Sequence, residues 1–467
     1  MADTAYSPGL RTGVVLTGAG TAGAYHAGAL RAIAESGIRV DVVAAHGAGA
    51  LTALASAVDG GPRVWDPAGP WTDARLHHAY RWRPALRVAW GGLLACFLLL
   101  LSPLVVLILA AAIYALATLA GLVSLTGVST ALVGWYSAAL AWLFDPPMMP
   151  TIVPRLLVLG VLVIAGVLVA ASWRAARVEG SRRRRVGAFW WRLLSWPLDA
   201  TEPSAIALDL LWQQVHGASS DKLPVAEALG RRYVDVLTDN FGEPGFHEVL
   251  IGVHDIDARR DVVGAVLSAS GRAAIETSRG GLDDRAGEIV DFTGPQRDML
   301  AGFLAGAFRL PVVTAPAVVA YGADDYWRGE RHRVCDRPDL VSRLVGEIAA
   351  LGVEQIILIG PAPRAARPHG IRATPIGLRA RMGELVRSLE SAALTDAVAV
   401  AASRCSSVFV VRPDHNPIGP FDFAGVYDES SDRLRTVAEL MQQGYADAYH
   451  RLIEPMVAAA DASETIG

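Results

Sequence analysis

The chain has 467 residues, enough for one large domain or two ordinary ones, and its formal net charge is −4. This balance gives no overall basic field, so we expect no nucleic-acid partner. Only 19% of the residues are charged and the mean hydropathy is +0.34, which is too apolar for an average soluble enzyme and predicts a membrane segment.

The cysteines are few and far apart in the sequence: Cys96, Cys335 and Cys405. An odd number with this spacing favours neither a disulfide framework nor a clustered zinc site, and we expect no metal or cofactor. The N-terminus lacks a basic segment followed by an apolar one, so no cleaved signal peptide is expected. The first part of the chain should therefore stay in the cytoplasm.

The first motif is a glycine-rich loop between a short β run and a helix, in the segment GVVLTGAGTAGAYHAGAL at 13–30. Free backbone amides at the start of a helix can bind a phosphate or a developing oxyanion. We therefore predict an anion-binding or oxyanion-binding loop made by Gly18, Ala19, Gly20, Thr21 and Gly23.

The same loop matches the G-x-G-x-x-G pattern of dinucleotide-binding proteins. That pattern requires an acidic residue near the end of the second strand, to bind the ribose hydroxyls. Here the second strand ends in Ala45-His46, and Asp41 lies near its beginning. A nucleotide-binding module and a purely structural glycine turn both remain as alternatives.

The second motif, DVVAAHGAGAL at 41–51, reads as a strand, a tight turn of small residues and a helix. Serine hydrolases present their nucleophile on such an elbow, because the strained turn needs small neighbours. Gly47 occupies the nucleophile position and has no side chain with which to attack a carbonyl carbon. His46 lies beside it, and we expect its side chain to point away from the site.

A long apolar block follows. Residues 88–144 contain no charged residue and no histidine, and a second apolar run at 156–173 has the length of a membrane span. We predict two spans, at about 90–120 and 153–173. The segment 125–144 is either a re-entrant or interfacial piece, or part of a four-span arrangement.

Arginines flank the apolar block on both sides, which predicts that both flanks are cytoplasmic. The run Arg182, Arg183, Arg184 and Arg185 either fixes this topology or holds anionic lipid headgroups. Nearby Trp190, Trp191 and Trp196 favour a stretch at the membrane interface.

We divide the chain into 1–80, a membrane insertion at 81–197, a second soluble part at 198–455 and a tail at 456–467. In the second soluble part, β runs alternate with helical stretches, which indicates an α/β sheet. The runs are EVLIGVHD (248–255), PAVVAY (316–321), QIILIG (355–360) and SVFVVRP (407–413). Because the first 80 residues hold only two strands, we expect both soluble parts to build one domain.

The order of the two motifs resembles the patatin-like phospholipase family, in which a Gly-Gly-Gly-x-Arg-Gly loop precedes Gly-x-Ser-x-Gly. The resemblance covers roughly 13–58 and 245–455. It implies a three-layer α/β sandwich with a mainly parallel sheet, here interrupted by an inserted transmembrane helical hairpin. It also implies a Ser-Asp dyad, and the segment at 326–360 places Asp336 at the aspartate.

Three departures from the family pattern coincide: Ala22 replaces the basic residue of the loop, Gly47 replaces the serine, and Arg337-Pro338 replaces two glycines. We therefore expect a catalytically impaired lipid acyl hydrolase on the cytoplasmic face of a membrane, which binds lipid or a protein partner. The alternative is an active hydrolase with an unidentified nucleophile, in which Asp336 is the base and the Gly18–Gly23 loop is the oxyanion hole.

The remaining candidates have simpler interpretations. Cys335 beside Asp336 is expected to be a small buried residue rather than a thiol nucleophile. The acidic pairs Asp324-Asp325 and Asp255-Asp257 are expected to be loop acids rather than metal ligands. The segment 412–422 is expected to be a loop, with His415 and Asn416 as possible rim contacts.

Overall fold

The computed structural model describes residues 6–58, 60–66, 69–178, 196–216, 223–279, 287–363, 377–414, 419–428 and 433–458. The chain separates into two compact units, each described by itself below. The first combines Met1–Arg81 with Leu198–Gly467, and the second is Trp82–Pro197.

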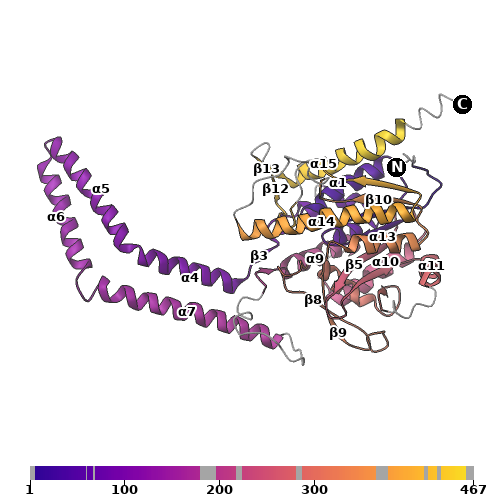
Figure 1. The fold of residues 1–467 in the computed structure, drawn as a ribbon, viewed down its shortest axis with the longest axis horizontal. Helices are drawn as coiled ribbons and strands as arrows, with labels where there is room; N and C mark the ends of the chain where they lie inside the picture. Colours follow the sequence, from indigo (N-terminus) through magenta and orange to yellow (C-terminus); the bar gives the residue numbers. More distant parts are fainter. Residues whose placement is uncertain are drawn as a thin grey trace. The chain divides into compact units, whose positions relative to one another are not determined.

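A nine-stranded mixed sheet forms the centre of the first unit (Figure 1). Its main path runs β11-β10-β1-β2-β5-β6-β7, and β9 pairs with both β5 and β8. Neighbours are parallel from β11 to β5, whereas the β5–β6, β5–β9 and β8–β9 pairs are antiparallel. The strands are β1 (Thr12–Leu16), β2 (Val42–Ala45), β5 (Glu248–Asp255), β6 (Arg260–Val266), β7 (Ile289–Asp291), β8 (Ala317–Ala320), β9 (Arg331–Cys335), β10 (Gln355–Ile359) and β11 (Ser407–Val411).

The two strands from the start of the chain lie in the middle of this sheet. β1 pairs with β10 on one side and with β2 on the other, and β2 in turn pairs with β5. Every residue of β1 and β2 is buried. Continuous apolar runs of this kind are typical of parallel strands covered on both faces.

The predicted β runs are confirmed as strands β5, β8, β10 and β11. The patatin-like α/β architecture is confirmed as well, since a mixed sheet carries helices on both faces. Smaller strands are β3 (Arg81–Trp82), β4 (Leu198–Asp199), and the antiparallel pair β12 (Gly425–Asp428) and β13 (Arg433–Thr436).

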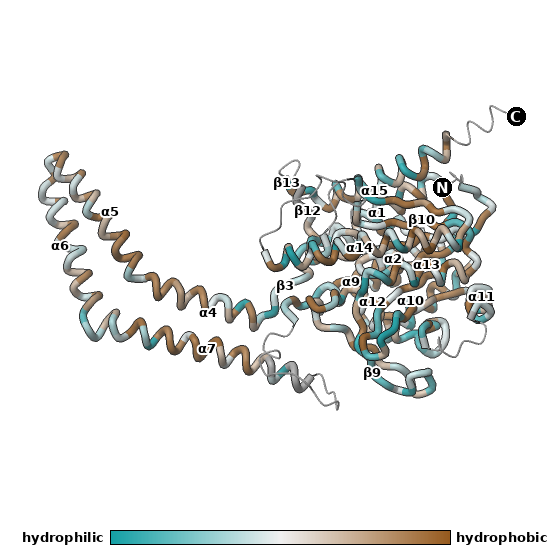
Figure 2. The backbone as a smooth tube through the Cα atoms, in the orientation of Figure 1, coloured by the Kyte–Doolittle hydropathy of each residue, from teal (hydrophilic) through white to brown (hydrophobic). Residues whose placement is uncertain are grey.

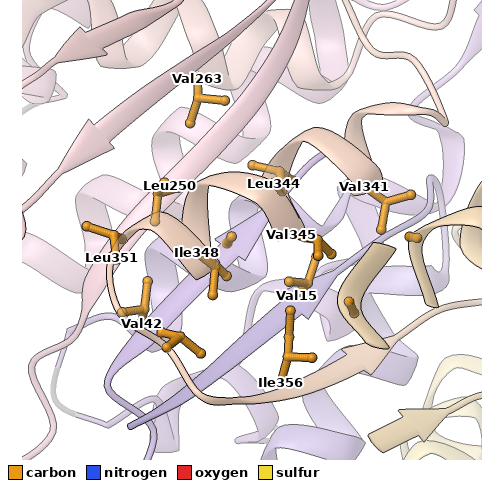
Figure 3. Packing of buried hydrophobic residues seen from close by; sticks show 14 of the residues in the cluster. Val15, Val42, Leu250, Val263, Val341, Leu344, Val345, Ile348, Leu351 and Ile356 are labelled. Carbon is orange, nitrogen blue, oxygen red and sulfur yellow. The ribbon is translucent and has the colours of Figure 1, made fainter. Parts of the chain in front are cut away.

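One face of the sheet is covered by α13 and α14. The hydrophobic core on this face joins Val15, Val42, Leu250 and Val263 of the strands to one side of α13, as Figure 3 shows. The helix contributes Val341, Leu344, Val345 and Ile348. The apolar residues recur along α13 at three- and four-residue spacing, so they share one side of the helix.

The other face is covered by α2 and α12, and α1 packs along α15. A Cβ on Gly306 of α12 would lie 2.8 Å from Val334 and 3.3 Å from Val253, so this helix lies close to the strands. The helices of this unit are α1 (Ala22–Glu35), α2 (Gly49–Ser56), α3 (Pro62–Trp65), α9 (Thr201–His216), α10 (Ala226–Asn240), α11 (Ala269–Arg279), α12 (Leu300–Ala307), α13 (Leu340–Ala350), α14 (Leu378–Arg404) and α15 (Val437–Ala448), with short helical turns η1 (Pro70–Thr72), η2 (Ala74–His78), η4 (Arg297–Met299) and η5 (Tyr449–Ile453).

The second unit consists of apolar helices: α4 (Pro84–Leu100), α5 (Ser102–Leu122), α6 (Thr126–Leu143) and α7 (Met149–Val178). Two segments, Ser102–Leu122 and Met149–Ala171, are long and apolar enough to cross a membrane, judged by length and composition. Few of their residues are buried within the unit. Figure 2 shows their hydrophobic character as brown stretches along the tube.

The predicted first span, at about 90–120, is wrong in its bounds because the helix breaks at Leu101. Pro103 lies in the first turn of α5, where the missing amide costs no hydrogen bond. The segment predicted as re-entrant or interfacial is the continuous helix α6.

Within this unit, α4 packs against α7 and α5 packs against α6. The α4–α7 contact is close, because a Cβ on Gly92 would lie 2.8 Å from Ile164 and one on Gly160 would lie 2.6 Å from the Cys96 sulfur. Across the other pair, the Tyr136 hydroxyl donates to a backbone carbonyl of α5, 2.5 Å away. The unit is therefore a hairpin of two arms, α4–α5 and α6–α7.

Candidate active site

The glycine-rich loop follows β1 directly and leads into α1. Gly18 has φ +113° and Gly20 has φ +62°, both in the region that side chains rarely adopt. All residues from Gly18 to Gly23 are buried. The sequence therefore turns sharply at the carboxyl end of the central strand, which is where parallel sheets commonly bind ligands.

The elbow follows β2, the neighbouring strand. Gly47 has φ +60°, and α2 begins two residues later. A Cβ built on Gly47 would lie 2.6 Å from the carbonyl oxygen of Gly18 and 3.1 Å from Oδ2 of Asp336. The predicted nucleophile position, the loop and the predicted acid therefore meet at one point.

Asp336 lies between β9 and α13, and β10 follows α13. Its side chain is 3% exposed, and its backbone amide donates to the carbonyl of Arg309, 2.7 Å away. Arg337 and Pro338, which replace the family's glycines, lie in the turn before α13, where the amide of Leu340 donates to the carbonyl of Arg337 at 3.1 Å.

His46 does not point away from the site, and that expectation was wrong. Its Nδ1 lies 2.8 Å from Oδ1 of Asp336, and its Nε2 lies 2.7 Å from the hydroxyl of Thr17. Leu16 and Ala45 are partners in the register of β1 and β2, so the next residues of both strands, Thr17 and His46, point to the same side. The result is a buried chain Thr17–His46–Asp336.

Two backbone amides at this point are already bonded within the protein. In hydrolases with this elbow, the amide after the nucleophile and an amide of a neighbouring loop form the oxyanion hole. Here the amide of Ala48 donates to the carbonyl of Gly18 at 3.0 Å. The amide of Ala19 donates to Oε1 of Glu390 at 3.1 Å.

Glu390 was not among the residues predicted from the sequence. It lies on the inner side of α14, between Val386 and Ala393, and is 3% exposed. Burial, reinforced by the nearby carboxylate of Asp336, raises the pKa of Glu390 to about 8. In the sequence, Glu390 could have been noticed as an acidic residue on the apolar side of a predicted helix.

The loop is covered by further segments of the chain. A Cβ on Gly20 would lie 2.5 Å from the carbonyl oxygen of Gly419, and one on Gly23 would lie 1.9 Å from the ring of Trp71. Phe421 packs edge-on against Tyr80, with ring centroids 5.7 Å apart. Backbone and aromatic rings therefore occupy the space over the loop.

A second histidine forms a hydrogen bond with the first residue of this buried chain. Nε2 of His26, on α1, lies 3.0 Å from the carbonyl oxygen of Thr17, the first residue of the buried chain. Burial lowers the pKa of His26 to about 3, so this imidazole is neutral at physiological pH. It therefore adds a hydrogen bond and no charge.

The other acidic candidates are bonded within the first unit. Asp255 lies 2.5 Å from Nδ1 of His332, and Asp257 forms an ion pair with Arg333 at 2.8 Å. Asp325 accepts from the amide of Gly322 at 2.5 Å. Among the residues that the structure describes, no three His, Cys, Asp or Glu side chains are grouped as metal ligands.

Cys335 is buried, and burial raises the pKa of its thiol to about 12, so it holds no reactive thiolate. Asp41 accepts from the amide of Thr12 at 2.9 Å, at the end of β1 opposite the loop, where it is too far away to serve a nucleotide there. The remaining predicted contacts, Arg182, Arg183, Arg184, Arg185, His415 and Asn416, lie outside the described residues.

Comparisons with known proteins bear on this site. The family model for the patatin-like phospholipase matches residues 14–107, a range that starts in β1 and includes both the loop and the elbow. Curated proteins gave no match. Among solved structures, VipD from Legionella pneumophila is similar at 10% identity and a TM-score of 0.31, over 96% of this chain and 67% of VipD. That likeness is too weak to bear on the fold.

The matched range contains the two motifs whose geometry is described above, on adjacent strands and in the family's order. The patatin-like phospholipase family model therefore matches the part of this chain that carries both motifs of the candidate site.

Proposed function

We propose that this protein is a membrane-anchored, catalytically impaired member of its family, whose cleft binds a lipid acyl group or a partner without hydrolysis. The observation that carries this proposal is the glycine at position 47. It has the positive φ and the proximity to Asp336 that suit a nucleophile, but no side chain.

The hydrogen bonds around Gly47 support the same conclusion. Loss of a nucleophile costs several kcal/mol of transition-state stabilisation, and loss of one oxyanion-hole donor costs about 3–4 kcal/mol. Here the amides of Ala19 and Ala48 are bonded to Glu390 and Gly18, and Asp336 is bonded to His46. A reaction at this site would lack its attacking group and would have to break existing hydrogen bonds.

The second unit supports membrane anchoring. Two of its helices have the length and composition of spans, and their apolar side chains are largely exposed. The pairing of α4 with α7 and of α5 with α6 favours one hairpin with two crossings over four separate spans. The basic residues that flank the apolar block support a cytoplasmic position for the first unit.

Hydrolysis of a short-chain ester tests the impairment. The full-length protein in detergent should give no turnover above a matched Asp336→Asn variant. Gly47→Ser alone should remain inactive because Glu390 still occupies the Ala19 amide, whereas Gly47→Ser combined with Glu390→Ala frees that amide and should gain activity. Gly47→Ala with Glu390→Ala is the control, since it reproduces the strain without the hydroxyl.

One observation favours the alternative of an active enzyme. The chain Thr17–His46–Asp336 has the order of nucleophile, base and acid found in serine hydrolases, with both hydrogen bonds below 3 Å. Against it, Thr17 is 2% exposed, and its methyl group packs close to Gly360. Wild-type turnover that disappears in Thr17→Val would establish this alternative and remove the impaired one.

A further inference from the structure

Glu390 occupies the backbone amide of Ala19 in the glycine-rich loop. Its Oε1 accepts the hydrogen bond of the Ala19 amide at 3.1 Å, and its Oε2, also buried, has no hydrogen-bond partner among the described residues. A buried polar atom without a hydrogen-bond partner destabilises the folded protein. This unpaired oxygen belongs to the same carboxyl group that is bonded to the Gly18–Gly23 loop.

The surroundings of Glu390 disfavour its charged form. Burial raises its pKa most, and Asp336, which follows β9, raises it further, whereas the Ala19 amide and Arg387 on the same helix act in the opposite direction with smaller effect. Asp336 is itself bonded to His46. Asp422, beyond the Gly419–Pro420 segment, also has a raised pKa because of burial. The raised pKa of Glu390 therefore favours its protonated form at neutral pH.

A protonated carboxyl group has the same outline as an ester, with one carbonyl oxygen and one neighbouring oxygen. The carbonyl oxygen takes the amide hydrogen bond, and the second oxygen lies in the dry interior. We propose that Glu390 is a built-in acyl mimic that closes the cleft, and that it withdraws to admit the uncharged ester carbonyl of a lipid. This inference rests on the proposed lipid-binding function and specifies its ligand and its control.

The elements that would move with Glu390 are identifiable. On α14, a Cβ on Gly383 would lie 3.5 Å from Phe421, and Arg379 donates to the carbonyl of Phe421 at 2.7 Å. The backbone of Gly419 and Pro420 in turn lies directly over Gly20. The first half of α14 and the segment 419–421 therefore form one cover over the loop.

The cover should open more readily as pH rises. A solvated glutamate has a pKa near 4.5, and burial raises that of Glu390 to about 8. The closed form is thus fully favoured below about pH 4.5, and its stability relative to the open form falls as the pH rises through about 8. The ratio of open to closed protein should rise about fifty-fold between pH 6 and pH 8.

Hydrogen exchange of the full-length protein in dodecyl maltoside, a detergent without ester groups, tests this directly. Protection of the peptide covering residues 17–23, corrected for the intrinsic pH dependence of exchange, should fall between pH 6 and pH 8 in the wild type. Glu390→Gln keeps the shape without the titration and should stay protected at both pH values. Glu390→Ala should be unprotected at both. Equal protection in all three proteins would overturn the proposal.

The ligand class has its own test on Glu390→Ala. Dihexanoylphosphatidylcholine, which carries ester carbonyls, should restore protection of residues 17–23. Hexanoate should not, because its charge faces Asp336. Restoration by hexanoate, or by neither probe, would overturn the ligand assignment. Neither outcome affects the impaired function, which the ester-hydrolysis assay tests separately.

Discussion

At the scale of single residues, the site is defined by position 47. The turn retains the strained φ of a nucleophile elbow, and glycine adopts it without steric cost. The carbonyl oxygen of Gly18 lies in the space that a side chain at position 47 needs, 2.6 Å from where its Cβ would be. Restoring a side chain therefore requires a shift of the loop backbone.

We therefore predict that Gly47→Ser and Gly47→Ala each destabilise the protein by about 1–3 kcal/mol, the usual cost of such strain. Thermal unfolding of the purified full-length protein would measure it. Similar losses in both variants indicate that the Cβ is responsible. A serine variant as stable as the wild type would show that the loop adapts freely.

The His46–Asp336 pair gives a second prediction. His46→Ala leaves the buried Asp336 carboxylate without its partner and should cost about 3–5 kcal/mol. Adding Asp336→Ala should recover part of that loss, because the unpaired charge is then removed. If the two losses simply add, the pair is not coupled in the way its 2.8 Å contact indicates.

At the scale of elements, most of the sheet could be predicted from the sequence. Strands such as β5 and β10 are runs of apolar residues bounded by polar ones, and this local pattern is sufficient to predict them. The orientation of His46 was missed because it depends on the register of β1 against β2, which no local pattern encodes. Glu390 was missed because a contact between α14 and the loop joins residues 371 positions apart.

The packing of α1 on α15 gives a prediction at this scale. A Cβ on Gly28 would lie 1.8 Å from the carbonyl oxygen of Met441, so the helices touch backbone to backbone. Gly28→Ala should therefore destabilise the protein, although alanine favours isolated helices by about 1 kcal/mol. Gly346→Ala, within α13, where a Cβ would meet only Arg404 at an ordinary 3.5 Å, should not destabilise the protein in the same melting experiment.

At the scale of the whole molecule, the apolar hairpin follows from composition alone, but its helix boundaries do not. The break at Leu101 comes from Pro103, and α6 is a continuous helix in the segment that was predicted to be re-entrant or interfacial, or part of a four-span arrangement. Both arms meet near Ser124, which has φ +64° in the turn between α5 and α6.

This turn gives a topological prediction. In a two-crossing hairpin, Ser124 lies on the opposite side of the membrane from both termini, whereas four spans would return it to the same side. A Ser124→Cys variant, with Cys96 and Cys405 replaced by alanine, should react with an impermeant maleimide only from the side away from the termini. Labelling from the same side would contradict the hairpin.

The central claim is that the family's site is preserved here without a nucleophile. Fluorophosphonate labelling of the full-length protein, followed by mass spectrometry, tests it most directly, because the probe modifies activated hydroxyl groups. The wild type should carry no adduct, and Gly47→Ser with Glu390→Ala should carry one at position 47. A wild-type adduct on Thr17, lost in Asp336→Asn, would contradict the account.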